Sequence, residues 1–300
     1  MRLFDLHADT PLKLYYEKRS FEDPALQVSA NDLSAFDFFG QVFACFSRPN
    51  LTDDEAYIAF FAMRDRLAEA LAPYRSPRFH PLLAVEDARL LGGSRDRLTA
   101  LAEAGVAILT PLWKGETVIG GAYDTDVGLS EFGRLALSDA VVLGIHPDAS
   151  HASYRAFFDM AEIAAKHNRP LLATHSDSYS VCPHPRNLRD DQFLAVRDLG
   201  GLVGLCLYPP HLSGSGRATV SDVLRHLEHW LLLGGEDTVA LGTDFDGIDI
   251  APTDLQRSRD LHLLFHTLAQ HGYPAALIEK LFCKNAEAFF GKYNTRQDVL

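Results

Sequence analysis

Eight short apolar segments alternate with segments of helical periodicity along the chain, and this alternation limits the possible folds more than any other feature. Because parallel strands need a long crossover connection, a regular strand–helix order predicts a parallel sheet covered by helices. Eight such units predict an α/β fold of one domain over residues 1–300, a (β/α)8 TIM barrel. The expected strands are residues 2–11, 41–47, 81–85, 105–112, 144–150, 169–174, 201–207 and 238–243.

Apolar residues at helical spacing separate most of these strands. The expected helices are residues 53–71, 95–104, 130–143, 152–167, 189–198, 220–233, 258–271 and 275–291, and residues 12–40 are expected to form a loop with a short helix. The alternative fold is an open, doubly wound sheet. A G-x-G-x-x-G loop after the first strand would favour that fold, and the sequence has none there, so the barrel is preferred.

Charge and composition exclude several classes of function. The net charge is -12 and no basic patch is visible, so nucleic acids and anionic membranes are not expected as partners. The first strand begins at residue 2, so we expect no signal peptide, and no apolar run approaches the ~20 residues of a membrane span. Four cysteines lie far apart, which is typical of reduced thiols in a cytoplasmic protein. We expect a cytoplasmic enzyme with a small-molecule substrate, and a homodimer as one possible assembly.

The first expected strand carries two potential metal ligands. Successive side chains on a strand point to opposite faces. The expected faces are Phe4, Leu6 and Ala8 on one side and Asp5, His7 and Asp9 on the other. An imidazole beside a carboxylate, as His7 and Asp9 would be, is a ligand pair suited to zinc. The alternative is a His–Asp hydrogen bond that closes the strand.

Four later strands also end at or beside a residue that binds metals or moves protons. These residues are Glu86, His151, His175 and Asp244. Each alone has a structural explanation, such as a helix cap at Glu86 or a turn at Asp244. Barrel active sites, however, are built from the carboxyl ends of several strands, so the recurrence at one end predicts an active site.

These residue types support hydrolysis at two metal ions. One zinc ion is expected on His7, Asp9 and one carboxylate oxygen of Glu86. The second is expected on the other oxygen of Glu86, His151 and His175. A bridging Glu86 would hold the ions roughly 3.5–4 Å apart, where they share a hydroxide and polarise a carbonyl.

Asp244 is expected to stay off the metals and to transfer protons. A carboxylate in that position can accept the proton of the attacking water and pass it to the leaving amine. Glu86 and Asp244 are therefore the expected catalytic residues.

Five stretches of the sequence resemble the membrane dipeptidase (renal dipeptidase) family of zinc metallopeptidases. They are His7–Pro11, Val85–Glu86, Asp148–Ser153, Thr174–Asn187 and Gly242–Gly247. The resemblance spans residues 4–247 with family-like spacing between the motifs. It implies a barrel of the amidohydrolase type with two zinc ions per chain. It also implies cleavage of dipeptides, often with a D-residue at the C-terminal position.

The same resemblance assigns individual residues. The metal ligands of the family fall on His7, Asp9, Glu86, His151 and His175. Asp244 falls on the catalytic aspartate of the family and Arg186 on its substrate-binding arginine. Guanidinium geometry favours bidentate capture of a carboxylate, which suits the free C-terminus of a dipeptide. The alternative for Arg186 is a loop residue paired with Asp190 or Asp191.

Three departures from the family concern the substrate and the location. Trp113 stands where mammalian members have a substrate-binding histidine, and His211 stands where they have a pocket tyrosine. We expect Trp113, His211 and Tyr208, where the seventh strand ends, to contribute to substrate binding. The chain also lacks the secretory and lipid-anchor segments of those members, so a membrane location is not expected.

Two other functions are compatible with the sequence. One is a different amidohydrolase activity on the same scaffold, such as an N-acyl-D-amino-acid deacylase or a lactonase. Several such enzymes bridge their metals with a carboxylated lysine, but Lys114 is the only lysine near an expected strand end, which favours Glu86 as the bridge. The other is a non-catalytic binding protein, which the complete set of potential ligands makes the weaker interpretation.

Overall fold

The structure is a computed structural model that describes residues 1–293. In this part of the chain, parallel pairing joins seven strands into one sheet. The strands are β1 (Arg2–Ala8), β2 (Phe38–Phe46), β3 (Phe79–Glu86), β4 (Val106–Thr110), β5 (His146–Pro147), β6 (Val203–Leu205) and β7 (Val239–Leu241). Their order is β5-β4-β3-β2-β1-β7-β6. Residues 294–300 of the expected domain lie outside the described part.

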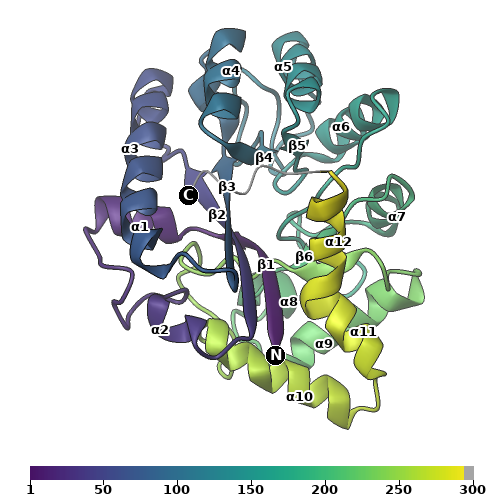
Figure 1. Cartoon of the computed structure of the whole chain (residues 1–300). Helices are drawn as coiled ribbons and strands as arrows, with labels where there is room; N and C mark the ends of the chain where they lie inside the picture. The colour runs from purple at the N-terminus through teal and green to yellow at the C-terminus, as the bar shows by residue number, and fades with distance from the viewer. Residues whose placement is uncertain (294–300) are drawn as a thin grey trace.

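Helices form the outer layer of the molecule. They are α1 (Thr10–Tyr16), α2 (Ala30–Leu33), α3 (Asp53–Leu71), α4 (Arg95–Glu103), α5 (Glu131–Val142), α6 (Tyr154–Lys166), α7 (Asp190–Asp198), α8 (Pro209–Leu212), α9 (Val220–Leu232), α10 (Leu261–Gln270), α11 (Ala275–Glu279) and α12 (Asn285–Lys292). Shorter helical turns cover Ala72–Tyr74, Ala88–Leu91 and Ser258–Asp260, and a π-helical turn over Lys280–Lys284 splits the expected helix 275–291. Figure 1 shows α3 to α7 arranged around the strands. The other expected helices are confirmed to within a few residues of their ends.

The first long helix, α3, illustrates why these segments are helical. Thr52 accepts a hydrogen bond from the backbone N–H of Glu55, and the Glu55 carboxylate accepts one from the N–H of Thr52 at 2.8 Å. This reciprocal capping satisfies two of the donors that a helix start leaves free. Buried side chains then recur along one face, at Phe60, Met63 and Leu67, and pack against the sheet.

The sixth expected strand, residues 169–174, is not a strand in the structure. Leu172 forms a single parallel bridge to Asp148, which follows β5, and Ala173 forms another to Val203 of β6. The segment therefore lies between the two end strands of the sheet, but pairs with each through one bridge only. The expected strand 144–150 is likewise reduced to the two residues of β5. The structure thus shows a curled sheet of seven parallel strands.

The interior of the curled sheet is filled from both the strands and the C-terminal helix. Phe4 and Leu6 of β1 belong to the same core cluster as Phe289 and Phe290 of α12. The ring of Phe290 stacks on that of Phe4 with a centroid separation of 5.2 Å. Helix α12, in yellow in Figure 1, therefore closes the amino end of the sheet. The polar residues at the opposite, carboxyl end are left free to form a site.

A bulge in β1 corrects the expected pattern of alternating faces. The pairing with β2 shifts register between Asp5 and Ala8, so β1 carries one extra residue there. As a result Ala8 packs in the outer core cluster and not with Phe4 and Leu6. Asp5 turns to the segment that follows β7, where it accepts hydrogen bonds from the hydroxyl of Thr243 at 2.6 Å and from its N–H at 2.9 Å. Asp5 is thus a structural residue.

Two glycines allow the backbone to pack tightly beside the site. A Cβ on Gly204 would lie 1.9 Å from the carbonyl oxygen of Thr174, and one on Gly242 would lie 1.7 Å from it. Real Cβ atoms cannot approach so closely, so both positions require glycine. This packing holds Thr174, and with it the neighbouring His175, at the carboxyl end of the sheet.

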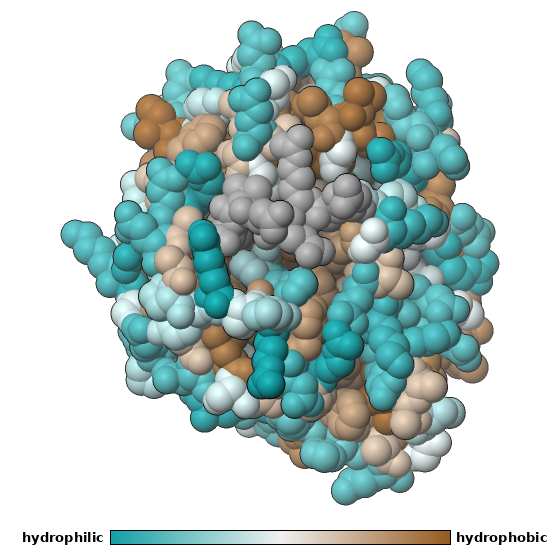
Figure 2. All heavy atoms as spheres, viewed as in Figure 1, coloured by the Kyte–Doolittle hydropathy of each residue, from teal (hydrophilic) through white to brown (hydrophobic). Residues whose placement is uncertain are grey.

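Polar side chains cover much of the face shown in Figure 2, with apolar patches between them. Within residues 1–293, no helix combines the length and the apolar character that crossing a membrane would require.

Candidate active site

The carboxyl ends of the strands bring the five expected ligands together. His7 comes from the bulged end of β1, Glu86 is the last residue of β3, and Asp9, His151 and His175 lie in the segments that follow strand ends. Four of the five side chains are buried and that of His151 is nearly so. Residues separated by up to 168 positions in the sequence thus share one small volume.

The carboxylate of Glu86 lies at the centre of this group. Its Oε2 is 3.6 Å from Nε2 of His7, and its Oε1 is 3.0 Å from Nε2 of His151. The same Oε1 is 3.7 Å from Nε2 of His175. Each oxygen therefore faces a different set of neighbours.

The donor atoms form two sets that share Glu86. One set is His7, Asp9 and Glu86, and the other is Glu86, His151 and His175, with the atoms of each set within 4.8 Å of one another. Nε2 of His7 and Oδ1 of Asp9 are buried without a hydrogen-bond partner. Unpartnered buried polar atoms are rare in native proteins, so atoms of this kind facing each other indicate a ligand. Imidazole and carboxylate donors fit zinc.

A hydrogen-bond network behind the site orients two of the imidazoles. The Thr174 hydroxyl donates to Oδ2 of Asp148 at 2.6 Å, because a carboxylate can only accept. Its oxygen then accepts from Nδ1 of His175 at 2.9 Å and lies 3.3 Å from Nδ1 of His7. A proton on Nδ1 of His175 leaves Nε2 with a free lone pair toward Glu86. The network therefore selects the tautomer that can bind a metal.

His151 is oriented in the same way by a different partner. Its Nδ1 lies 3.1 Å from the carbonyl oxygen of Trp113, which can only accept, so Nδ1 carries the proton. Its Nε2 lies 2.9 Å from Nε2 of His175. Two unprotonated ring nitrogens this close would repel each other, and a cation bound between them and Glu86 would remove the repulsion.

Burial and the carboxylates set the charges of the site. Burial lowers the pKa of His151 to about 4 and that of His175 well below its ordinary value, so both rings are neutral, as metal ligands must be. Burial opposes a charge on His7 too, but the adjacent carboxylates of Asp9 and Glu86 raise its pKa well above the ordinary value. Burial and the charge of Glu86 raise the pKa of Asp9 to about 6.

Asp244 lies beside the two donor sets. Its carboxylate is within 4.8 Å of the ring nitrogens of His7 and His175. Burial, with further contributions from the Asp9 and Glu86 charges, raises the pKa of Asp244 to about 8. A Cβ on Gly247 would meet Oδ2 of Asp9 at 2.2 Å and Oδ1 of Asp244 at 2.7 Å. The glycine thus leaves space for the two carboxylates.

Arg186 is buried next to the imidazoles. One of its Nη atoms donates to the carbonyl oxygen of His175 at 3.3 Å, while its Nε has no hydrogen-bond partner. Arg186 and His151 both line a cavity of about 140 Å³, together with Tyr123 and Arg189. A guanidinium and an expected metal ligand thus face the same space. The expected alternative, an ion pair with Asp190 or Asp191, is not formed among the described residues.

The other expected substrate residues lie around this cavity but outside its lining in the described part of the chain. Trp113 is half-buried and packs on Phe46, with ring centroids 4.9 Å apart. Tyr208 and His211 pack edge to face at 4.9 Å, and His211 is buried. Trp113, Tyr208 and His211 therefore lie near the site. Their contact with a substrate stays a prediction.

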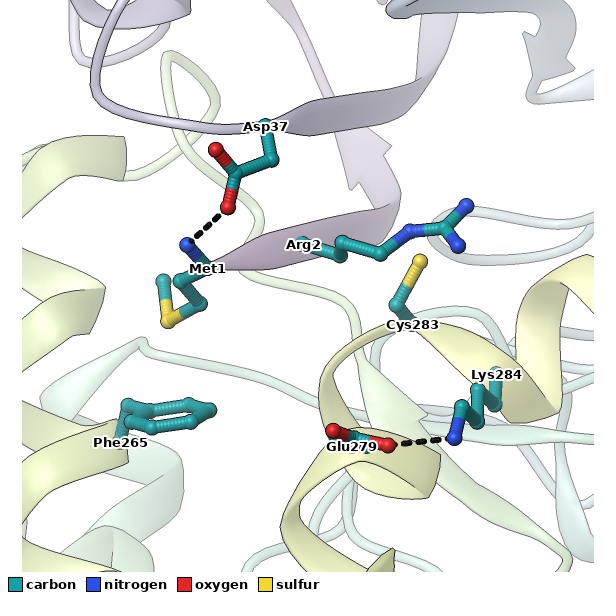
Figure 3. Close-up of a pocket in the computed structure, with 7 residues that line it drawn as sticks. All are labelled: Met1, Arg2, Asp37, Phe265, Glu279, Cys283 and Lys284. Carbon is teal, nitrogen blue, oxygen red and sulfur yellow. Dashed lines mark hydrogen bonds and ion pairs between the residues drawn. The ribbon is translucent and has the colours of Figure 1, made fainter. Parts of the chain in front are cut away.

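A larger cavity, of about 430 Å³, lies near the start of β1 and so at the opposite end of the sheet. Figure 3 shows the residues that line it, including the Met1 amino group paired with Asp37 at 2.8 Å and Lys284 paired with Glu279. These charges neutralise one another. The smaller cavity at the carboxyl end is therefore the better candidate for the substrate site.

Comparison with known proteins identifies the family. Residues 59–296 match the model of a family described as membrane dipeptidase (peptidase family M19). The chain belongs to this family. It is therefore a metallopeptidase of the M19 dipeptidases, which hydrolyse peptide bonds. A Klebsiella pneumoniae protein described as uncharacterized, in the pqqA 5′ region, is 36% identical over 244 residues, which cover 76% of this chain and 89% of that protein.

Solved M19 structures share the fold over nearly the whole length. A crystal structure described as a dipeptidase and metallopeptidase of family M19 has 27% identity and a TM-score of 0.89, and covers 99% of both chains. A metallopeptidase from Rhodobacter sphaeroides, liganded with a phosphinate mimic of the dipeptide L-Ala-D-Ala, has 25% identity and a TM-score of 0.88. That match covers 98% of this chain and 99% of the other.

The sequence interpretation missed the residues behind this M19 site. Asp148 accepts hydrogen bonds from Thr110 at 2.6 Å and from the N–H groups of Ser150 and Thr174 at 3.0 and 2.8 Å. The available signal was their position at the ends of expected strands, since Asp148 lies three residues before His151 and Thr174 lies one residue before His175. Asp246 accepts hydrogen bonds from Thr10 and Gln27, so it anchors a loop.

We predict that Thr174→Val weakens metal binding. The change removes the hydroxyl that orients His175 and keeps the size of the side chain, and loss of such a partner usually costs about 10–100-fold in metal affinity. Competition with a chelator measures the affinity. Thr267→Val, on an exposed part of α10, is the matched control and is expected to leave the affinity unchanged. Unaltered affinity in Thr174→Val would mean that the network does not set the tautomer.

Proposed function

We propose that this M19 peptidase is a two-zinc dipeptidase. The observation that carries the proposal is the position of Glu86, whose two carboxylate oxygens face two separate donor sets. In this assignment His7 and Asp9 complete one zinc site, and His151 and His175 complete the other. The cytoplasmic location expected from four unpaired, buried cysteines forms part of the proposal.

We further propose that the fold is the (β/α)8 barrel of the amidohydrolase type. Residues 169–174 would take the place of the eighth strand. Their bridges to Asp148 and Val203 support this reading, because they fill the interval between the two end strands of the sheet.

The two zinc ions would supply an activated water nucleophile at neutral pH and polarise the scissile carbonyl. The chain would then move the protons. Asp244 is placed to take the proton of the attacking water, since its carboxylate lies beside both donor sets. Without a cation its raised pKa of about 8 would leave the carboxyl largely protonated at neutral pH. Bound cations would lower that pKa toward neutrality, where the carboxyl can also return the proton to the leaving amine.

Arg186 would bind the C-terminal carboxylate of the substrate. Its guanidinium is buried beside the imidazoles, lines the 140 Å³ cavity, and has an unpartnered Nε. A buried unpaired charge is costly, so an anionic group of the substrate would stabilise it. We propose acceptance of a D-residue at that position, which the L-Ala-D-Ala mimic bound to the Rhodobacter relative supports.

The zinc stoichiometry tests the two-metal assignment. Metal-free protein loaded with zinc and freed of excess is expected to hold about two equivalents, and chelation is expected to abolish dipeptide hydrolysis. Glu86→Gln should lose zinc from both sites and activity, because an amide cannot bridge two cations. Glu116→Gln, in an exposed loop, is the control. One tight equivalent with full activity, or normal zinc content in Glu86→Gln, would contradict the assignment.

Asp244→Asn tests the proton transfer. We expect the variant to keep its zinc and its melting temperature but to lose roughly 10²–10⁴-fold in kcat, as removal of a general acid–base does. Asp237→Asn, at an exposed position, should behave as wild type. If Asp244→Asn loses zinc instead, Asp244 is a ligand, which its nearness to His7 and His175 would permit.

A matched pair of substrates tests the role of Arg186. Amidation of the C-terminus of L-Ala-D-Ala should lower kcat/KM by about 3 kcal/mol, on the order of 100-fold, because the buried guanidinium loses its partner. Arg186→Gln should hydrolyse the acid and the amide at similar rates. Arg189→Gln, at the exposed rim of the same cavity, should keep the discrimination. Equal rates in the wild type would refute the role.

A further inference from the structure

A third group of potential metal ligands lies next to the two donor sets. It consists of Asp177, Cys206 and His211, and one ligand atom from each residue lies within 4.8 Å of the other two. Asp177 follows the bridged segment 172–173, Cys206 follows β6, and His211 lies in α8. All three side chains are buried. The group shares no residue with the sets around Glu86.

The carboxyl group of Asp177 is poorly satisfied in the structure. The residue is fully buried and no hydrogen bond of good geometry reaches Oδ1 or Oδ2; the backbone N–H of Cys206 lowers the pKa only in part, and burial raises it well above the ordinary value. Burying a carboxylate in this way costs several kcal/mol unless a charge or a set of donors compensates for it. Such a group therefore requires an explanation, and a ligand bound against both oxygens supplies one.

The geometry of the group fits a divalent cation. Sγ of Cys206 lies 3.9 Å from Nδ1 of His211. Around a tetrahedral zinc ion, with Zn–S of about 2.3 Å and Zn–N of about 2.0 Å, such atoms stand about 3.5 Å apart, so a contraction of a few tenths of an ångström is enough. Burial and the charge of Arg186 lower the pKa of His211 to about 2, so its ring is neutral and able to ligate.

The charges balance for a 2+ ion. Burial keeps Asp177 and Cys206 neutral in the absence of a cation, and with a cation bound they would together contribute two negative charges. Arg186 and Asp244, of opposite sign, are further charged groups that act on both. Burial raises the pKa of the Cys206 thiol well above its ordinary value, and a bound cation would reverse this shift, since metals deprotonate the thiols that coordinate them. One carboxylate, one thiolate and one imidazole form a ligand class typical of zinc.

We propose that Asp177, Cys206 and His211 form a third metal site, which binds a zinc-like divalent cation with one open position. The site would join three separate segments at the carboxyl end of the sheet. It would also act on the catalytic centre, because Sγ of Cys206 lies 3.8 Å from Oδ2 of Asp244. The proposal goes beyond the two-zinc function and depends on none of its ligands.

Sulfur ligation gives this site a spectroscopic signature of its own. The two sets around Glu86 contain only nitrogen and oxygen donors, so cobalt bound there gives no thiolate-to-cobalt charge transfer. Full-length protein is freed of metal with a chelator and titrated with Co²⁺ while the near-ultraviolet and visible spectra are recorded. We expect about three equivalents to bind, and a near-ultraviolet charge-transfer band to accompany one of them.

Three variants assign the band. Cys206→Ser should lose it and bind one equivalent fewer, and Asp177→Asn should weaken that equivalent at least tenfold. Cys283→Ser is the matched control, because this buried thiol lies at the opposite end of the sheet, in the cavity of Figure 3, and its loss should leave the band unchanged. Asp177→Asn keeps the test decisive if Cys206→Ser fails to fold.

Two results would overturn the proposal. Saturation at two equivalents without a charge-transfer band rejects the third site and leaves the two-metal function intact. A band that persists in Cys206→Ser or disappears in Cys283→Ser assigns the sulfur elsewhere and also rejects it. Conversely, a band with only one equivalent bound would support the third site while the two-zinc proposal fails.

Discussion

The buried carboxylate of Glu86, surrounded by three imidazole nitrogens, is the interaction on which the rest of the site depends. Burial alone would raise its pKa, but the adjacent imidazoles of His151 and His7 hold the pKa well below the ordinary value, so the group is ionised. A charge in such a place must be paired. The partners come from different strands, and only a sheet curled until its ends approach each other can bring them together. The chemistry of this M19 peptidase therefore depends on the curvature of the sheet.

Thr174 links the position of the neighbouring His175 to the packing of the backbone. Its carbonyl oxygen fits between Gly204 and Gly242, where no side chain can be accommodated. Its hydroxyl joins Asp148 to the Nδ1 atom of His175. The same residue therefore fixes the position of the neighbouring histidine through its backbone and the tautomer through its side chain. Residues 172–173, which pair through single bridges, are held in place by this packing more than by a strand ladder.

The sequence predicted most of the helices, their alternation with parallel strands along the chain, and the convergence of His7, Glu86 and His175, because periodicity and strand-end position are local signals. The sequence-based prediction failed for features that depend on pairing with a neighbouring strand. The bulge of β1 is set by its register with β2, so the alternation expected for Ala8 was wrong. The strand expected over residues 169–174 was wrong for the same reason. The poorly satisfied carboxyl group of Asp177 is invisible in the sequence, since an aspartate after a strand usually reaches water.

Two residues of the site adopt a strained backbone conformation. His151 and Asp244 both have φ above +60°, at 68° and 61°, in the left-handed region that costs a side chain of order 1 kcal/mol or more. Glycine would remove this strain at either position but would also remove the imidazole or the carboxylate. Asp246 has a similar φ of 65°, yet its carboxylate accepts hydrogen bonds from Thr10 and Gln27, which stabilise the loop. His151 contacts the Trp113 carbonyl through Nδ1 and lies 3.0 Å from Oε1 of Glu86 through Nε2. The metal site that we propose on Glu86, His151 and His175 would therefore use the strained conformation, because that conformation aims Nε2 at the shared carboxylate.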